Sequence, residues 1–465
     1  MNTQIDSIQH HCGVAGFFNN NGENIPQRLF YSLFSLQHRG QESAGIAYRK
    51  GDRLVAYKDL GMVSSVLSRY LEEPRISNVG IGHVRYSTRG GNRLENAQPI
   101  LVSCNKGEIA LAHNGNLSNA EELRNELETE GSIFQSLSDT EIILHLLARS
   151  RQETFYSALR EILEKLEGAY SMVFIHDRTL YAVRDPRGFR PLYLGINGET
   201  TAVASETCAL EIHKMSGMRE VEPGEIVRID ETGVHSDFFR RNEKAARCVF
   251  ELIYFARPDS RVFDQSVHLM RKRTGAALAR TDTVEADIVV PVPDSGSNAA
   301  LGYAEESGIP MEYGLTRNHY VGRSFILPNT SERELAVRMK LHPVREAIHG
   351  KRIVLIDDSL VRGTTSKILV RLLKEAGAAE VHLRLCAPEI KWPCFFGIDI
   401  PTRGELISNS MNPGEISAFI GADSVRFLPQ EELYGCLEDP EGYCYACFDG
   451  RYPVPIERER RQDHG

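Results

Sequence analysis

The sequence predicts two domains of different class: an α+β layered domain, followed by an α/β domain with a parallel sheet. Three observations support this. In the first half, short apolar runs broken by glycine alternate with two helical stretches. A charged stretch at 240–247 follows, and beyond it mostly apolar strands alternate with helices. Apolar strands that alternate with helices are typical of a parallel sheet buried on both faces.

Length and composition narrow the class of protein. The chain has 465 residues, of which 42% are hydrophobic and 25% charged, with a formal net charge of −9. This length predicts two or three domains. The acidic balance argues against a surface that binds nucleic acid or anionic membrane over the whole chain, but it leaves room for a local basic pocket. No apolar run approaches the ~20 residues of a membrane helix, and residues 1–11 lack a secretory signal, so we expect a cytoplasmic protein.

Periodicity predicts the elements of the first domain. Strands are expected at 13–18, 45–48, 79–84, 171–175 and 179–183. Helices are expected at 120–130, capped by Asn119, and at 139–148, which opens with acidic residues.

The most specific motif of the second half is the string 352–365. A buried strand ends at Asp357 and Asp358, and a short loop leads through Gly363 into a helix expected at 366–376. A helix N-terminus approached by glycine can bind an anion. Because the carboxylates repel phosphate, they are expected to face sugar hydroxyls or a Mg²⁺ ion. The alternative is a capped helix with no ligand.

Two neighbouring segments extend this motif. The strand 288–293 leads into Asp294, Ser295, Gly296 and Ser297, which can present backbone N–H groups to a pyrophosphate. The segment 317–342 is rich in cationic side chains and is either an ordinary surface loop or a loop that closes over substrate. Those side chains are Arg317, His319, Arg323, Arg333, Arg338 and Lys340.

Cys12 is followed by Gly13, which leaves its thiol uncrowded. Taken alone, a cysteine is more often buried and inert. Charged and amide side chains recur in four further strings, at 37–45, 82–88, 113–116 and 138–141. The string 37–45 either lines a site around Cys12 or is a charged turn between elements.

Together these strings resemble the class II, N-terminal-nucleophile glutamine amidotransferases, and the string 352–365 resembles the signature of type I phosphoribosyltransferases. The resemblance implies a propeptide at 1–11 and an αββα sandwich at 12–240. It further implies an α/β phosphoribosyltransferase domain with a parallel sheet at 248–430 and a Cys-containing extension at 431–465.

For the first domain, the resemblance implies that Cys12 becomes the first residue after removal of 1–11. Arg85 would then bind the carboxylate of glutamine, and Asp139 its α-amino group. Asn114 and Gly115 would form the oxyanion hole. Removal of the propeptide makes chemical sense, because a free α-amino group, with a pKa near ~8, can act as the base for its own thiol.

For the second domain, the resemblance implies a site for phosphoribosyl pyrophosphate. Asp357 and Asp358 would contact the ribose and Mg²⁺, and the hydroxyl of Ser295 would approach the metal. The 5′-phosphate would be held by Arg362, Gly363, Thr364, Thr365 and Ser366.

Nine cysteines in a chain of this length argue against a disulfide framework. The spacing of Cys444 and Cys447 is typical of a metal site, and with Cys248 and Cys394 it could bind zinc or a 4Fe–4S cluster. Cys436 is a rival ligand. The resemblance favours the cluster over zinc. The chain resembles the branch of the family whose members have both a 4Fe–4S cluster and a propeptide. Cys104, Cys208 and Cys386 are expected in the core.

As a whole, the chain resembles the glutamine-dependent amidophosphoribosyltransferases. That implies formation of 5-phosphoribosylamine, glutamate and pyrophosphate, the first committed step of purine synthesis. It also implies inhibition by purine nucleotides and a homodimer or homotetramer. The segment 254–260 resembles the inter-domain segment of the family, although packing alone could explain its aromatic residues.

Two other functions remain as alternatives. One is a regulator that uses a phosphoribosyltransferase fold only to sense its ligand, but no helix-turn-helix or basic stripe accompanies it. The other is a class II amidotransferase that aminates a sugar phosphate, which Asp357 and Asp358 disfavour.

Overall fold

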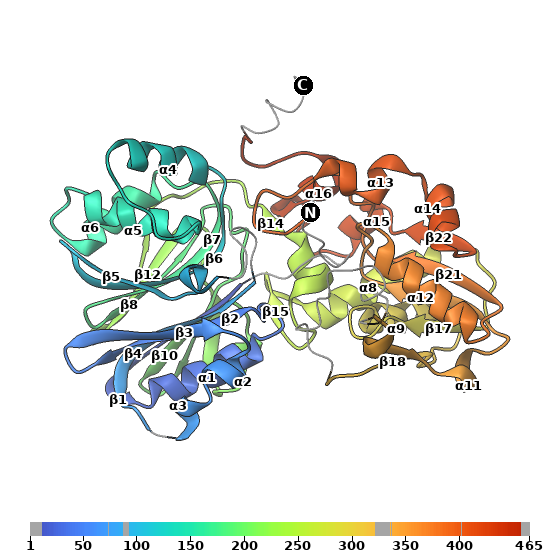
Figure 1. Cartoon of the computed structure of the whole chain (residues 1–465), viewed down its shortest axis with the longest axis horizontal. Coiled ribbons are helices and arrows are strands. Elements are labelled where there is room, and N and C mark those ends of the chain that lie inside the picture. The colour runs from blue at the N-terminus through green and yellow to red at the C-terminus, as the bar shows by residue number, and fades with distance from the viewer. Residues whose placement is uncertain are drawn as a thin grey trace.

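The computed structural model describes residues 12–72, 74–86, 93–320, 335, 337–400 and 402–456. The expected propeptide, 1–11, lies outside them. Figure 1 shows two domains side by side, with the N-terminal half in blue to green and the C-terminal half in yellow to red.

The first domain contains two antiparallel sheets, which stack face to face between outer helices (Figure 1). In the described residues, one sheet has the order β11 (Ser216–Glu220), β9 (Tyr193–Asn197), β10 (Thr200–Ala204), β1 (Gly13–Glu23), β4 (Ser77–Arg85), β2 (Ser43–Lys50) and β3 (Arg53–Leu60). The other has the order β13 (Gly233–Phe238), β12 (Glu225–Asp230), β8 (Thr179–Arg184), β7 (Gly168–His176), β6 (Gly107–Leu117) and β5 (Ile100–Cys104).

Apolar side chains from both sheets form the central core, which includes Val14, Ala112 and Val173. A second core lies beneath α4 (Ala120–Thr129), α5 (Asp139–Arg149) and α6 (Phe155–Leu163), and a third beneath α1 (Ile25–Ser35). Because side chains alternate along a strand, each sheet has one face for its partner sheet and one for its helices. This confirms the predicted αββα order, and each expected strand and helix of this domain is present.

The capping of α4 differs from the prediction. Asn119 does not cap the helix with its side chain; its amide donates instead to the carbonyl of Lys165, at 2.9 Å. By contrast, the hydroxyl of Ser138 accepts from the backbone N–H of Thr140 and caps α5. Asn119 thus bonds with a backbone group 46 positions away, which local sequence does not reveal.

The second domain is built on a parallel sheet with the order β17 (Ile288–Pro291), β20 (Arg352–Asp357), β21 (Glu380–Leu385) and β22 (Ser424–Phe427). Helices α8 (Val267–Arg280) and α9 (Ser297–Ser307) pack on one side, and α12 (Thr364–Glu375) and α14 (Pro413–Ile420) on the other. The predicted parallel sheet is confirmed. Helix α12 begins two residues earlier than the predicted start at 366.

Shorter elements account for the other helices and strands of the described residues. They are α2 (Val63–Val66), α3 (Arg69–Glu72), η1 (Leu94–Asn96), α7 (Cys208–Glu211), β14 (Arg247–Cys248), η2 (Glu251–Phe255), β15 (Arg261–Val262), β16 (Gln265–Ser266), β18 (Leu315–Arg317), β19 (Leu341–Pro343), α11 (Arg345–Ile348), η3 (Arg403–Glu405), α13 (Ile407–Ser410), α15 (Gln430–Gly435), η4 (Pro440–Gly442), β23 (Tyr443–Cys444) and α16 (Ala446–Asp449).

Residues distant in sequence meet at the junction of the domains. β14, just after the charged stretch, pairs in parallel with β23 near the end of the chain. The side chains of Leu433 and Phe448 belong to the same apolar cluster as those of Phe250 and Met270. The segment after 431 therefore packs into the second domain.

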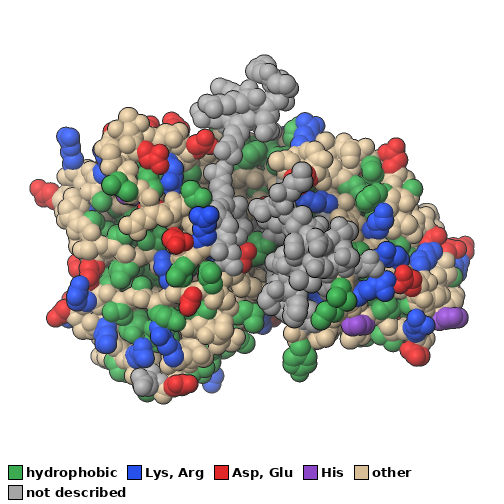
Figure 2. Space-filling view, in the orientation of Figure 1, with side chains coloured by type: hydrophobic (Ala, Val, Ile, Leu, Met, Phe, Trp, Pro, Cys, Tyr) green, Lys and Arg blue, Asp and Glu red, His purple; other side chains and the backbone are tan. Residues whose placement is uncertain are grey.

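On the face shown in Figure 2, cationic and anionic side chains are interspersed over the described residues of both domains. Among the described helices, none combines the length and the apolar character needed to cross a bilayer.

Candidate functional site

Cys12 lies immediately before β1, the strand that pairs with β10 on one side and β4 on the other. Its thiol donates to the carbonyl oxygen of Tyr86, with the sulfur 3.6 Å from that oxygen. Burial raises the pKa of this thiol; the hydrogen bond to Tyr86 and the positive charge of Arg85 lower it, and Glu42 and Asp139 raise it. The fold thus brings Arg85 and Asp139, both predicted from sequence, into the electrostatic range of Cys12.

Arg85 is the last residue of β4 and is 6% exposed. Its guanidinium lies 3.8 Å from the carboxylate of Glu42, and the backbone N–H of Glu42 donates to the Arg85 carbonyl. Gly40 makes this approach possible, because a Cβ at that position would lie 2.6 Å from the Arg85 backbone. The segment 37–45 therefore packs directly against the candidate site.

Asn114 and Gly115 lie near the end of β6. The side chain of Asn114 is fully buried, and among the described residues neither its Nδ2 nor its Oδ1 has a hydrogen-bond partner. Gly115 has a φ of 154°, and a Cβ there would overlap the carbonyl oxygen of Ala169. A buried amide without a hydrogen-bond partner costs about 1–3 kcal/mol of stability. Its N–H group could donate a hydrogen bond to an oxyanion that develops during a reaction.

Asp139 begins α5 and is bonded to both sides of this segment. Its Oδ2 accepts from the backbone N–H of Leu117 at 2.9 Å, and its Oδ1 lies 3.7 Å from Nδ1 of His113. Burial lowers the pKa of His113, although the carboxylate of Asp139 partly opposes that shift.

A network of four buried charged side chains lies behind Cys12, and three of them, Arg190, Glu206 and Glu251, escaped the sequence prediction. Arg39 donates from Nε to the Cys12 carbonyl at 3.1 Å and forms ion pairs with Glu206 at 2.6 Å and Glu251 at 2.8 Å. Arg190 joins Glu251 at 3.1 Å. Burial raises the pKa of Glu206, but the charges and hydrogen bonds of His38 and Arg39 outweigh it and hold that pKa far below its usual range.

No sequence pattern predicted this network. Its members come from four separated segments, and a charged residue carries no local sign that it is buried. The one available signal was the string 37–45, which contains Arg39 but not its partners. Such a network persists only when every charge in it is paired.

In the second domain, Asp357 and Asp358 stand at the carboxyl end of β20. The hydroxyl of Ser295 donates to Oδ1 of Asp357 at 3.0 Å. Burial raises the pKa of Asp357 well above its usual value, and the neighbouring carboxylate of Asp358 raises it further. Two carboxylates gathered this way favour a bound cation. A Cβ on Gly296 would overlap the carbonyl of Ile356, so a glycine is needed to bring the two loops together.

The loop after Asp358 leads into the N-terminus of α12. Gly363 is the N-cap, in the left-handed conformation at φ 81°, and it offers no side chain to cap the helix. Arg362 pairs with Glu405 at 3.0 Å. Because such half-exposed pairs contribute only about 0–1 kcal/mol, a phosphate could replace Glu405 as the partner. Thr364, Thr365 and Ser366 form the first turn.

The basic segment 317–342 is described only in part. Arg317 pairs with Asp294, and Arg338 with Glu375 at 3.1 Å. Arg323 and Arg333 lie outside the described residues, so the predicted loop closure stays a prediction.

Four of the predicted cysteines gather at the domain junction. Cys248 is the β-partner of Cys444. Burial raises the pKa of Cys447 well above its usual value, and Cys444, Cys394 and Cys248 raise it further through charge repulsion. The described side chains nevertheless include no group of three or more His, Cys, Asp or Glu placed to bind a metal.

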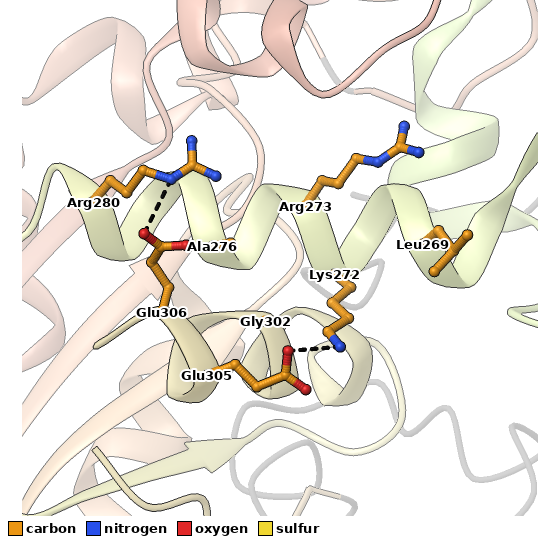
Figure 3. A pocket seen from close by; sticks show the side chains of 8 residues that line it. All are labelled: Leu269, Lys272, Arg273, Ala276, Arg280, Gly302, Glu305 and Glu306. Carbon is orange, nitrogen blue, oxygen red and sulfur yellow. Dashed lines mark ion pairs between the residues drawn. The ribbon is translucent and has the colours of Figure 1, made fainter. Parts of the chain in front are cut away.

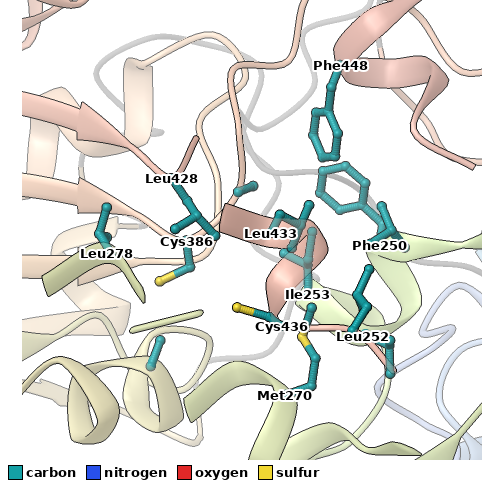
Figure 4. Close-up of a cluster of buried hydrophobic side chains, with 14 of the residues drawn as sticks. Phe250, Leu252, Ile253, Met270, Leu278, Cys386, Leu428, Leu433, Cys436 and Phe448 are labelled. Carbon is teal, nitrogen blue, oxygen red and sulfur yellow. The ribbon is translucent and has the colours of Figure 1, made fainter. Parts of the chain in front are cut away.

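Four other cysteines, besides Cys12, lie outside this predicted set: Cys436, Cys386, Cys208 and Cys104. Cys436 and Cys386 share one apolar cluster with Cys248 and Cys447. Cys436, the rival ligand, belongs to the apolar core that contains Cys386, and Figure 4 shows the two close together among apolar side chains. Cys208 is buried as expected, whereas Cys104 is only half-buried at the edge of the core beneath α4–α6.

A surface groove of about 500 Å³ lies along α8 and α9 and contains none of the predicted site residues. Figure 3 shows its ion pairs, Lys272 with Glu305 at 2.6 Å and Arg280 with Glu306 at 3.3 Å. Most of its charges are therefore already compensated.

Comparison with known proteins gives concordant results. The glutamine amidotransferase domain family matches residues 83–211. The amidophosphoribosyltransferase of Bacillus subtilis is 46% identical over 471 aligned residues, which cover 100% of this chain and 98% of the relative. That of Methanocaldococcus jannaschii is 45% identical, over 97% of this chain and 99% of the relative.

Two solved structures are similar over almost the whole chain. One, described as the allosteric regulatory enzyme of purine biosynthesis, has a TM-score of 0.91 and 46% identity, and covers 96% of this chain and 97% of its own. The other is the B. subtilis glutamine phosphoribosylpyrophosphate amidotransferase complexed with ADP and GMP. It has a TM-score of 0.89 and 46% identity, over 96% and 98% of the two chains.

Proposed function

Because this chain belongs to the amidophosphoribosyltransferase family, we propose that its two clusters of polar residues act in series. The chain is a glutamine phosphoribosylpyrophosphate amidotransferase and catalyses the first step of purine biosynthesis. The first cluster, around Cys12, would release ammonia from glutamine, and the second, around Asp357, would direct it to the sugar. One observation carries this proposal: Cys12, Arg85 and Asp139 converge although 127 positions separate the first from the last in sequence.

In the glutaminase reaction, the thiol of Cys12 attacks the side-chain amide carbon of glutamine. Its proton passes to the α-amino group that is freed when residues 1–11 are removed. The carbonyl oxygen becomes an oxyanion, which the amide of Asn114 and the N–H of Gly115 stabilise. The C–N bond then breaks, ammonia leaves with the proton, and water hydrolyses the thioester to give glutamate and the free thiol.

Glutamine recognition would fall to Arg85 and Asp139, two charged residues within electrostatic range of the thiol. The guanidinium of Arg85 suits the α-carboxylate of glutamine, because planar guanidinium and carboxylate groups form paired hydrogen bonds. The carboxylate of Asp139 suits the α-amino group. The support is that both charges act on the Cys12 thiol, with Arg85 buried at the end of β4.

In the second reaction, the ammonia nitrogen attacks C1 of phosphoribosyl pyrophosphate. The bond from C1 to the pyrophosphate oxygen breaks, pyrophosphate leaves, and 5-phosphoribosylamine forms. Arg362 to Ser366, at the start of α12, would hold the 5′-phosphate. Asp357 and Asp358 would bind the ribose hydroxyls, and with Ser295 they are the residues that fit a Mg²⁺ ion. When bound, that ion neutralises charge on the departing pyrophosphate.

Cys248, Cys394, Cys444 and Cys447 would bind a 4Fe–4S cluster with a structural role. The support is that Cys248, Cys394 and Cys444 all lie within electrostatic range of the Cys447 thiol, and four thiolates are the usual ligands of such a cluster. A zinc ion would use the same ligands. Analysis of iron and sulfide against zinc separates the two.

Further properties of the relatives extend to this chain as proposals. Purine nucleotides would inhibit the enzyme, since the B. subtilis structure holds ADP and GMP. We expect a homodimer or homotetramer in the cytoplasm, and an inter-domain role for residues 254–260. In that segment, the backbone N–H of Arg257 and the hydroxyl of Ser260 donate to Glu206.

The decisive experiment measures pyrophosphate and glutamate after mixing the protein with phosphoribosyl pyrophosphate and either glutamine or ammonia. Cys12→Ala should abolish product formation from glutamine and preserve it from ammonia. Cys104→Ala, a half-buried cysteine outside the site, is the matched control and should preserve both. Loss of both activities in Cys12→Ala would contradict two separate reaction sites.

A further inference from the structure

Residues 395–397 of the second domain contact the first domain beside the strand that carries Asn114 and Gly115. The side-chain amide of Asn116 donates from Nδ2 to the carbonyl oxygen of Phe395 at 2.8 Å. The guanidinium of Arg190 donates to the carbonyl of Phe396. Gly397, at φ 96°, lies so close that a Cβ on it would be 3.3 Å from the carbonyl carbon of Gly115.

Asn116 belongs to the same strand, β6, as the candidate oxyanion donors. Side chains two residues apart project from the same face of a strand, so Asn116 and Asn114 share a face. The next residue, Leu117, is bonded to Asp139 of the first domain. Besides its pairing with β7, the end of β6 is therefore held by two hydrogen bonds, and the one made by Asn116 reaches the other domain.

This contact is small in energy but well placed to affect geometry. One amide-to-carbonyl hydrogen bond contributes about 1 kcal/mol to stability. The domains are also joined by the buried ion pairs of Glu251 with Arg39 and Arg190. Catalytic donors, in contrast, must be held within about 0.5 Å of their productive positions.

We propose that Asn116 is a positioning residue for glutamine hydrolysis. By donating to the Phe395 carbonyl, it holds the last residues of β6 in place, so that the Asn114 amide and the Gly115 N–H point at the oxyanion. Gly397 allows this close contact because it has no side chain to separate it from Gly115. This inference rests on the proposed role of Asn114 and Gly115 in the glutaminase reaction. It makes that reaction, and not the ammonia-dependent one, sensitive to the position of residues 395–397.

The test compares Asn116→Ala and Asn116→Asp with the unchanged enzyme, using glutamine or ammonia as the nitrogen source. The aspartate has the same shape but cannot donate from its carboxylate. We expect the kcat for glutamine hydrolysis to fall about tenfold to a hundredfold, because small displacements of catalytic groups have effects of that size. The KM for glutamine should stay within about twofold, since ground-state binding rests on Arg85 and Asp139. The ammonia-dependent activity should be unchanged.

The affinity for a transition-state analogue distinguishes a positioning role from a purely structural role, because a structural role would leave that affinity unchanged. An aldehyde analogue of glutamine adds to the Cys12 thiol and forms a hemithioacetal whose oxygen occupies the oxyanion position. Its affinity should fall by the same factor as kcat in both variants. Gly397→Ala should show the same pattern, because its methyl group would press on Gly115.

The matched control is Asn119→Ala. Asn119 is partly buried, like Asn116. Its amide also donates to a backbone carbonyl, that of Lys165, but this hydrogen bond lies wholly within the first domain. It should lower thermal stability without changing the ratio of glutamine-dependent to ammonia-dependent activity. An unchanged ratio in Asn116→Ala, or a change in KM alone, would overturn the inference.

Failure of the underlying proposal would look different. Asn114→Ala and Cys12→Ala belong in the same series. If either of them kept full glutaminase activity, the assignment of the glutaminase site itself would be wrong. If both lost it while Asn116→Ala did not, the site would stand and the positioning role of Asn116 would fall.

Discussion

Arg39 donates a hydrogen bond from Nε to the carbonyl oxygen of Cys12 at 3.1 Å, from a position with no solvent exposure. The same guanidinium holds Glu206 and Glu251. The backbone at the nucleophile is thus fixed by a side chain whose partners come from both sides of the domain junction.

Replacing Arg39 with alanine should strongly destabilise the protein. The change leaves the buried carboxylates of Glu206 and Glu251 each one partner short, and breaking a buried pair this way costs about 3–5 kcal/mol. Urea-induced unfolding measures the loss. Arg160→Ala, which breaks an exposed pair with Asp237, should cost no more than about 1 kcal/mol. Equal losses in the two variants would argue against a special role for the buried network.

His83 should make stability depend on pH. Burial lowers its pKa to about 3, so the folded imidazole stays neutral. Below its ordinary pKa of about 6.5 the unfolded chain takes up a proton there, and stability falls as pH drops from about 6.5 towards 3. Between pH 8 and pH 5 this single group should cost about 2 kcal/mol. His83→Gln should remove that part of the loss, measured as unfolding free energy at both pH values; identical pH profiles would refute the assignment.

Asn114→Ala should reduce the kcat for glutamine hydrolysis about a hundredfold to a thousandfold, because it removes a donor to the oxyanion. The KM for glutamine should change little, and the ammonia-dependent reaction should be spared. Steady-state kinetics with each nitrogen source measure both. The variant should also fold at least as stably as the parent, because the Asn114 amide is buried without a partner. A marked drop in melting temperature would indicate a structural role instead.

Asp357→Asn should abolish pyrophosphate release with glutamine and with ammonia alike, because either nitrogen source needs the same sugar site. The measurement is pyrophosphate release over a range of Mg²⁺ concentrations. Asp423→Asn is the matched control: this acid pairs with Lys374 at 2.6 Å in the same domain. It should retain the activity. Preserved ammonia-dependent activity in Asp357→Asn would contradict the proposed site.

Cys444→Ser and Cys436→Ser should separate the metal ligands from the core cysteines. The first variant should lose its iron and inorganic sulfide, and the second should retain both, because Cys436 lies beside Cys386 and is not among the thiols that raise the pKa of Cys447. Elemental analysis of purified protein, together with visible absorbance, measures this. Zinc in place of iron in the parent protein would replace the proposed cluster by a zinc site.

Several features of the fold could be predicted because they are local. An apolar strand that ends in Asp357 and Asp358 and turns through Gly363 into a helix has its geometry encoded in adjacent residues. The helix that begins at Asp139 was equally clear, since Ser138 caps it from the preceding position. The cap assigned to Asn119 was wrong because its actual partner, Lys165, lies 46 positions away.

The order of residue types along the chain determined the two domain classes, the strand ends that bear polar groups, and the candidate residues proposed for each site. Only the tertiary structure decided which distant residues meet: Arg39 with Glu251, Cys248 with Cys444, and Asn116 with the Phe395 carbonyl. The physical reason is that periodicity and turn chemistry act over a few residues, whereas burial and charge pairing depend on how whole sheets and domains pack.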